Sequence, residues 1–336
     1  MKNERPIDRV RNSAATIRVG GEDSSEISEM LSTSDGLYVL RGNSVHRVRL
    51  ADEIDPGRTN IAVPNVSQSV LDAGTDNDIV ATILLTSKEL FDHQNATVSE
   101  STSLLFERCV DLTKKMLDLD NLVSQISSEI LSKADLGVQA FTSVRSVHIP
   151  SCPGLESRVT SILLQADKVR EALLGICKAE WVDASIKKPR IEDIDAAARL
   201  RIGSETDLGA SWDDVLNYLK RLRDYRNACE HPKDGQTVVV EDFSVQPDGA
   251  VCPPILEVQH KVNPQSRVLV TDFLLVLRQD LLMCAELILV LVGMSRLSKI
   301  GSSNVRIFQV PEEQRRKKYV RFYRAINIHG NWHILG

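Results

Sequence analysis

The sequence predicts a mainly α-helical protein: a four- to five-helix bundle with a β-hairpin insertion between the last two main helices and small β-rich or irregular flanks. Three observations predict this class. Two long segments carry apolar residues at alternating spacings of four and three. Two further segments, after Gly209 and at roughly 268–297, also have helical patterns. The composition is 42% hydrophobic but only 4% aromatic, so Leu, Ile and Val must fill the core.

The N-terminal third predicts a tail, a hairpin and helices. Residues 1–35 are rich in Ser, Asp and Glu without periodicity, so we expect a flexible tail. Segment 36–98 should hold a hairpin followed by helices. Residues 36–50 alternate between apolar and polar around Gly42-Asn43, which is a hairpin signal. Residues 65–74 and 77–94 predict a short and a longer helix, with three candidate N-caps: Asn65, Asn77 and Asp78.

Residues 99–298 should form the helical bundle. The first long helix is predicted by an apolar stripe of Leu105, Cys109, Leu112, Met116, Leu119, Val123, Ile126 and Ile130. The second begins at Leu155 and should end near Lys187-Lys188-Pro189, and 191–201 can add a short helix. The third begins with Ser211 as a plausible N-cap, and the fourth covers roughly 268–297. Four such helices make a bundle.

Two β-rich segments accompany these helices. Residues 236–262 contain two β-branched runs around Pro247-Asp248-Gly249, which predicts a projecting hairpin. The extension 299–336 is basic and has strand-like runs at 304–310, 319–326 and 331–335, without a clear pairing scheme.

The net charge and the cysteine pattern argue against several classes of protein. A net charge of −5 argues against a protein that coats nucleic acid indiscriminately. The six cysteines are scattered without a C-x-x-C pair, so neither a zinc ribbon nor a disulfide framework is indicated, and a cytoplasmic location is expected. Residues 1–21 carry charges but no apolar run, so we expect no secretory signal there. The most apolar stretch, 273–294, contains Arg278, Asp280 and Glu286, so no membrane association is expected.

The stretch "RLRDYRNACEHP", residues 221–232, contains the candidate site. On a helical wheel Arg226 falls within the apolar arc set by Trp212, Val215, Leu216, Leu219 and Leu222. Its guanidinium must therefore be paired or solvated. One interpretation is structural: the head reaches water at the bundle end, or it pairs with Glu107 or Asp111. The other is a binding site.

His231 stands directly before Pro232, which disfavours helical backbone angles, so the helix should end there. The imidazole can then reach the helix mouth beside Arg226. Alternatively, it only caps the last carbonyl groups. The same R-x-x-x-x-H spacing occurs at Arg41–His46 and Arg324–His329, outside helical patterns, so the spacing alone is weak.

The segment "YRNACEHP" resembles the R-N-x-x-x-H signature, a form of R-x(4–6)-H, of the HEPN superfamily. The resemblance covers about residues 99–297. It implies a HEPN-like four- to five-helix bundle with the motif at the end of a late helix. Many HEPN proteins are metal-independent endoribonucleases of toxin–antitoxin, phage-defence and RNA-processing systems, whereas others are binding modules.

The resemblance also implies roles for three residues. Arg226 would bind the scissile phosphate, His231 would act as general base or acid, and Asn227 would orient the pair or a phosphate oxygen. No metal or cofactor is implied. Because one histidine cannot readily serve as both acid and base, we expect a homodimer with two motifs in one cleft. An antitoxin or a nucleotidyltransferase is the expected partner.

Two other readings of the chain stay open: a non-catalytic HEPN-fold module that binds nucleotide, RNA or protein, and an unrelated helical interaction protein whose Arg226 and His231 are structural.

Two further clusters are candidates. The basic run 312–324 is a candidate RNA-binding segment because it interleaves cations with aromatic residues, namely Arg315, Arg316, Lys317, Lys318, Tyr319 and Arg321; a solvated charge run is the alternative. The second cluster comprises four potential metal ligands, but their irregular spacing argues against a zinc site: Cys229, His231, Cys252 and His260.

Overall fold

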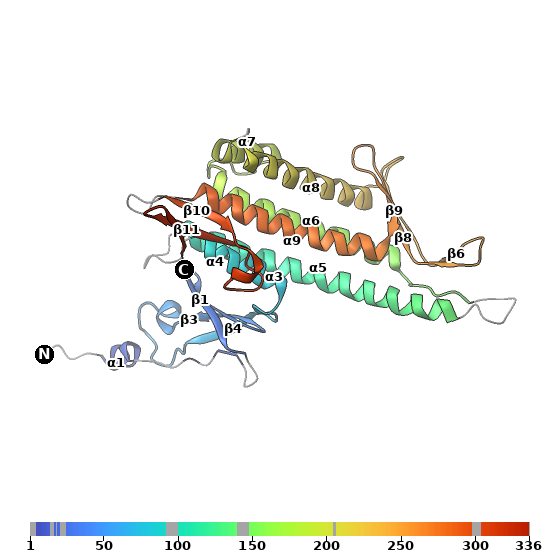
Figure 1. Cartoon of the computed structure of the whole chain (residues 1–336). Coiled ribbons are helices and arrows are strands. Elements are labelled where there is room, and N and C mark those ends of the chain that lie inside the picture. The colour runs from blue at the N-terminus through green and yellow to red at the C-terminus, as the bar shows by residue number, and fades with distance from the viewer. Residues whose placement is uncertain are drawn as a thin grey trace. The chain divides into compact units, whose positions relative to one another are not determined.

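The computed structural model describes residues 5–13, 17, 19–20, 25–91, 100–139, 148–203, 206–297 and 304–335. Within these residues, helices account for 52% and strands for 21%, the strands forming four separate sheets (Figure 1). The predicted mainly α bundle is therefore wrong, and the fold is mixed α and β. The error has a physical reason: several short segments satisfy their backbone hydrogen bonds by pairing with another strand, and periodicity within one segment does not reveal that partner.

By its contacts the chain divides into two compact units, Met1–Thr113 with Val292–Gly336, and Lys114–Leu291. This division differs from the predicted boundaries, of which 98/99 and 298/299 lie outside the described residues. Helices α5 (Glu100–Gln139) and α9 (Val270–Ser295) contribute residues to both units.

The first unit contains a four-stranded antiparallel sheet of order β1-β2-β3-β4. Its strands are β1 (Ile27–Thr33), β2 (Gly36–Arg41), β3 (Val45–Arg49) and β4 (Val66–Leu71). The predicted β2-β3 hairpin is confirmed. Residues 27–33, expected in a flexible tail, instead form β1, and the expected helix at 65–74 is β4. Asn65 therefore does not cap a helix at 65–74. Its Oδ1 instead accepts the N–H of Ala51, the first residue of another short helix, at 2.8 Å.

Short helices accompany this sheet: α1 (Pro6–Asn12) and α2 (Ala51–Ile54). The helix predicted from residue 77 is confirmed as α3 (Asp78–Val80), the π-helical η1 (Ala81–Leu85) and α4 (Thr86–Leu90). Asn77 is its N-cap, since its Oδ1 accepts the N–H groups of Ile79 and Val80 at 2.9 and 3.3 Å. The predicted end at 92–94 lies outside the described residues.

A three-stranded antiparallel sheet closes the first unit. It consists of β10 (Val305–Gln309), β11 (Phe322–Ile328) and β12 (Asn331–Ile334). The short 3-10 helix η2 (Glu312–Gln314) lies in the connection between β10 and β11. The predicted C-terminal strands are confirmed, and their pairing order is β10-β11-β12. Packing is tight where α9 meets this unit's core: a Cβ added at Gly293 would lie 3.0 Å from Ile307 Cδ1 and 3.1 Å from Leu90 Cβ.

The second unit is built on long helices. The predicted helices are confirmed as α5, α6 (Leu155–Trp181), α7 (Ile191–Ile202), α8 (Asp207–Glu230) and α9, but α6 ends before the predicted position near 187–189. The full apolar stripe predicted for α5 is buried. Trp181 of α6 and Trp212 of α8 meet edge to face, with ring centroids 5.4 Å apart. Figure 1 shows α8 running alongside α6, with β8 and β9 at the end of α8 where residue 230 lies.

The predicted hairpin between α8 and α9 is confirmed and extended. β5 (Thr237–Glu241) pairs with β8 (Ile255–Gln259), and β8 pairs with a third strand, β9 (Gln265–Leu269). The tip is the two-stranded ribbon β6 (Ser244–Val245) and β7 (Val251–Cys252), whose turn uses Gly249 at φ 85°. The helix predicted to begin at 268 begins at Val270 because 268–269 belong to β9.

Candidate functional site

Helix α8 holds the motif in its last turn. Thr206 caps the helix, because its Oγ1 accepts the Gly209 N–H at 3.0 Å, so the helix begins before the predicted cap Ser211. The predicted apolar face is confirmed, since its members Trp212, Val215, Leu216, Leu219 and Leu222 are buried. This face anchors the helix and fixes the position of the turn that follows.

Arg226 lies at the edge of that buried face, with its side chain 35% exposed. Its Nε lies 4.0 Å from Asp167 Oδ2, and one terminal nitrogen forms an ion pair with Glu230. The other terminal nitrogen donates to Asn227 Oδ1 at 3.1 Å. The acids that pair with it are therefore Asp167 and Glu230 rather than the predicted Glu107 or Asp111. The guanidinium reaches the surface while its stem packs against the helices.

Asp167 extends this pairing into a network between α6 and α8. It also accepts from Arg170 Nε at 2.6 Å, and Arg170 forms a second ion pair with Glu171. The Arg170 side chain is only 8% exposed, so its charge is compensated where water has little access. Arg170 of α6 and Arg226 of α8 thus share the carboxylate of Asp167, which helps to orient the Arg226 guanidinium.

His231 is the C-cap of α8, with φ −133° and ψ 60°, and its backbone N–H donates to Asn227 O at 2.9 Å. The predicted helix end before Pro232 is confirmed. The residue is exposed. No hydrogen bond joins its imidazole to another described side chain, so the structure brings Arg226 and Asn227 together and leaves His231 facing solvent.

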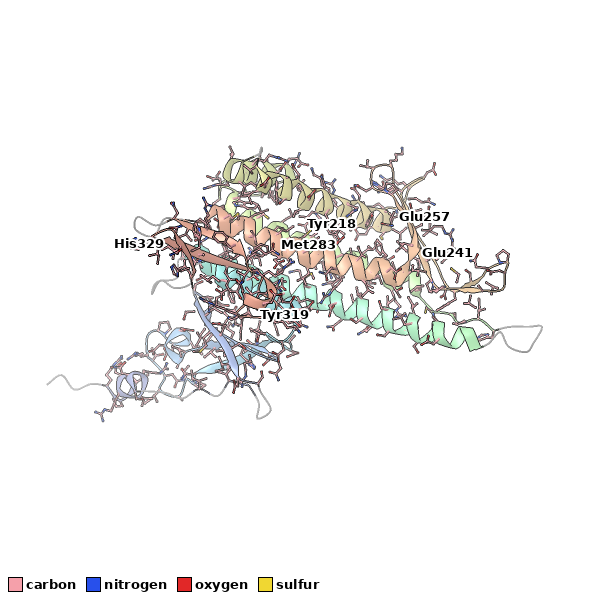
Figure 2. The ribbon with its side chains drawn as sticks, viewed as in Figure 1. Tyr218, Glu241, Glu257, Met283, Tyr319 and His329 are labelled. Atoms are coloured by element: carbon pink, nitrogen blue, oxygen red, sulfur yellow. The ribbon has the colours of Figure 1, made fainter. Side chains whose placement is uncertain are left out.

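The other two R-x-x-x-x-H spacings have different surroundings. His46 is buried in β3, 8% exposed, with Nε2 3.2 Å from Ser44 Oγ, and burial lowers the pKa of its imidazole. Arg324 is buried in β11 and donates from Nε to Glu89 O at 3.0 Å. His329, labelled in Figure 2, is exposed in a turn at φ 51°. Only the spacing at 226–231 lies at a helix end.

The candidate RNA-binding run before β11 is largely held by its own unit. Lys317 pairs with Glu29 and lies 3.8 Å from Glu89. Arg315 Nε donates to Val310 O at 3.2 Å, and Arg316 donates to Ile334 O at 3.3 Å. These three cations stabilise the loop.

The rest of that run stays nearer the surface. Lys318 lies over the ring of Tyr319 at 4.8 Å, and Arg321 lies 5.9 Å from the ring centre of Phe322. Tyr319, labelled in Figure 2, is half-buried. Tyr323 is fully buried, so its ring has no free face for a base.

The cysteines and histidines near the motif do not converge. Within the described residues no group of three or more His, Cys, Asp or Glu side chains is placed to hold a metal ion. Burial raises the pKa of the Cys229 thiol to about 11, while Thr160 hydrogen-bonds to it. A thiol with so high a pKa is a poor nucleophile at neutral pH.

Two cavities open beside α8 in the second unit. One, of about 470 Å³, lies between α6, α7 and α8 and includes Arg170 and Arg223 in its wall. The other, of about 200 Å³, lies between α8 and α9 and is lined mainly by apolar groups, together with Tyr218 (labelled in Figure 2), Arg221 and Asp280. No local sequence pattern predicts either cavity, because the wall of each comes from separate helices.

Comparison with known proteins adds no relative: no family model, no curated protein and no solved structure matches this chain. Among the described helices none is both long and apolar enough to cross a membrane.

Proposed function

We propose that the chain is a metal-independent endoribonuclease of the HEPN type, a toxin or phage-defence effector. The observation that carries the proposal is the arrangement at the end of α8. An exposed His231 directly follows the helix, and Arg226 is held by Asn227 in the turn before it. Both side chains reach solvent, where a phosphodiester can approach.

The chemistry follows from these groups. An imidazole takes the proton from a ribose 2′-hydroxyl, whose oxygen attacks the adjacent phosphorus, while the bond from phosphorus to the 5′-oxygen breaks. The leaving oxygen receives a proton from a second acid, so the products are a 2′,3′-cyclic phosphate and a 5′-hydroxyl. Arg226 would stabilise the charge on the phosphate oxygens. A homodimer would supply the second His231, and an antitoxin or nucleotidyltransferase would control the enzyme.

A second function, a non-catalytic module that binds nucleotide, RNA or protein, is favoured by one observation. Asp167 and Glu230 already pair with the Arg226 guanidinium. A phosphate must therefore compete with carboxylates for this cation.

The test is cleavage of total RNA in the presence of a chelator by wild type, Arg226→Ala and His231→Ala proteins. We expect wild type to cleave and both variants to lose at least about a hundredfold in rate. His329→Ala is the matched control, since it removes an exposed histidine at the same spacing from an arginine, and it should cleave normally. Folded wild type that leaves varied RNAs intact would favour the binding module.

A further inference from the structure

The larger cavity of the second unit has the composition of an anion site. Its wall comes from α6, α7 and the connection between them, and from Arg223 of α8. The volume of about 470 Å³ is within the range of about 300–1,000 Å³ that small-molecule sites occupy. Four cations line it: Arg170, Lys178, Arg190 and Arg223.

Three of these four cations are available to a ligand. Arg170 is already compensated by Asp167 and Glu171. Neither Lys178 nor Arg190 forms an ion pair with any described carboxylate, and both residues are exposed. Arg223, with its side chain 42% exposed, has only a distant pairing of 3.6 Å with Asp224.

The acids in the wall do not balance these cations. Glu171 is taken by Arg170, and Glu192 is the other carboxylate of the lining. Three available cations therefore face one available acid. In a recess partly shielded from water, such an excess of positive charge attracts an anion more strongly than it would on an open surface.

Apolar residues and a glycine alternate with these cations along the same elements of the lining. A Cβ added at Gly175 would meet no atom within 4 Å, so this position in α6 leaves space. Leu174, Ile191 and Ile194 line the same cavity. A ligand with an anionic end and an apolar part therefore finds partners for both in this lining.

We propose that this cavity binds a phosphorylated small molecule of nucleotide size, with Lys178, Arg190 and Arg223 holding the phosphate and the apolar lining residues contacting the base or sugar. A free nucleotide and a nucleotide unit of an RNA chain share this chemistry. The RNA source rests on the proposed ribonuclease function, since Arg223 lies one turn before Arg226 and Arg170 shares Asp167 with it. The free-nucleotide source does not.

Calorimetric titration of the full chain tests the proposal, with ATP, adenosine and an RNA dodecamer as probes. ATP should bind with an affinity that falls as salt rises, and adenosine should bind at least about tenfold more weakly because it lacks the charge-assisted hydrogen bonds. Binding of the dodecamer without ATP binding identifies RNA as the source. Failure of both ATP and the dodecamer to bind folded protein overturns the proposal.

Variants locate the site. The double substitution Lys178→Gln with Arg190→Gln, and Arg223→Gln alone, should each weaken ATP binding at least about tenfold. The matched control Arg221→Gln removes an arginine of the same helix that lines the other cavity, and it should change affinity less than about twofold. Equal losses in the control and the cavity variants overturn the proposal. Nucleotide binding without RNA cleavage would leave the site standing and reject the ribonuclease.

Discussion

At the residue scale, the partners of Arg226 differ in how firmly they hold it. Asp167 is 16% exposed and is fixed by a second arginine. Glu230 is 33% exposed and lies four residues along the same helix. Exposed pairs at this spacing contribute only about 0.3–0.5 kcal/mol, so a phosphate can displace Glu230 at small cost while Asp167 keeps the guanidinium oriented. The network is therefore compatible with phosphate binding.

Among the histidines at R-x-x-x-x-H spacing, His46 carries a pH signature. Burial, with a smaller contribution from Arg41, lowers its pKa below the ordinary value of 6.5. The unfolded chain then binds more protons than the folded one between the two pKa values, so stability decreases as pH falls from about 6.5. We expect His46→Gln to flatten this part of the dependence of the unfolding free energy on pH.

The measurement is urea unfolding at several values between about pH 5 and pH 7. His333→Gln is the control, because it removes a strand histidine of the same unit that is exposed, and it should keep the wild-type slope. An unchanged slope in His46→Gln would show that burial of this imidazole does not penalise its charged form.

At the scale of single elements, two helical glycines predict opposite effects of the same substitution. Gly175 in α6 has no atom within 4 Å of an added Cβ, so Gly175→Ala should stabilise by about 0.5–1 kcal/mol through helix propensity. A Cβ added at Gly293 in α9 would lie 3.0 Å from Ile307 Cδ1 and 3.1 Å from Leu90 Cβ, and overpacking costs about 1–3 kcal/mol. Gly293→Ala should therefore destabilise.

Thermal and urea unfolding of Gly175→Ala and Gly293→Ala measure the two predicted changes in stability. A similar gain in stability for both would mean that the neighbours of Gly293 yield without cost, and a loss for Gly175→Ala would mean that its surroundings are not open.

The same elements show what the sequence predicts and where it stops. The stripe from Leu105 to Ile130 predicts its helix because the signal lies within one segment. Segment 66–71 forms a strand because β3 offers an unpaired edge, which no local pattern records. At the site, Pro232 predicts the end of α8, but Asp167 enters through packing of α6 on α8. Contacts between helices are long-range, and one sequence does not contain them explicitly.

At the scale of the whole molecule, a net charge of −5 restricts where RNA can bind. The cation Lys317 of the C-terminal run is spent on Glu29 and Glu89. Arg223, a cation beside the motif, belongs to α8 of the second unit, so we expect RNA to approach the motif along α8. Each chain supplies one His231, which cannot readily serve as both general base and general acid. The two roles therefore require two chains.

Mixing experiments test this requirement for two copies. If each cleavage site needs His231 from both subunits, only dimers of two wild-type chains are active. Wild type and His231→Ala are mixed in equal amounts and allowed to exchange subunits. The cleavage rate should then be about a quarter of that of wild type alone at the same total protein concentration, whereas independent sites would give about half. Light scattering during size-exclusion chromatography should show dimers. Mixing with His329→Ala should leave the rate unchanged, since that histidine lies outside the motif. A linear fall with the wild-type fraction, or a monomer that cleaves, would reject the composite site while leaving Arg226 and His231 as a single-chain site.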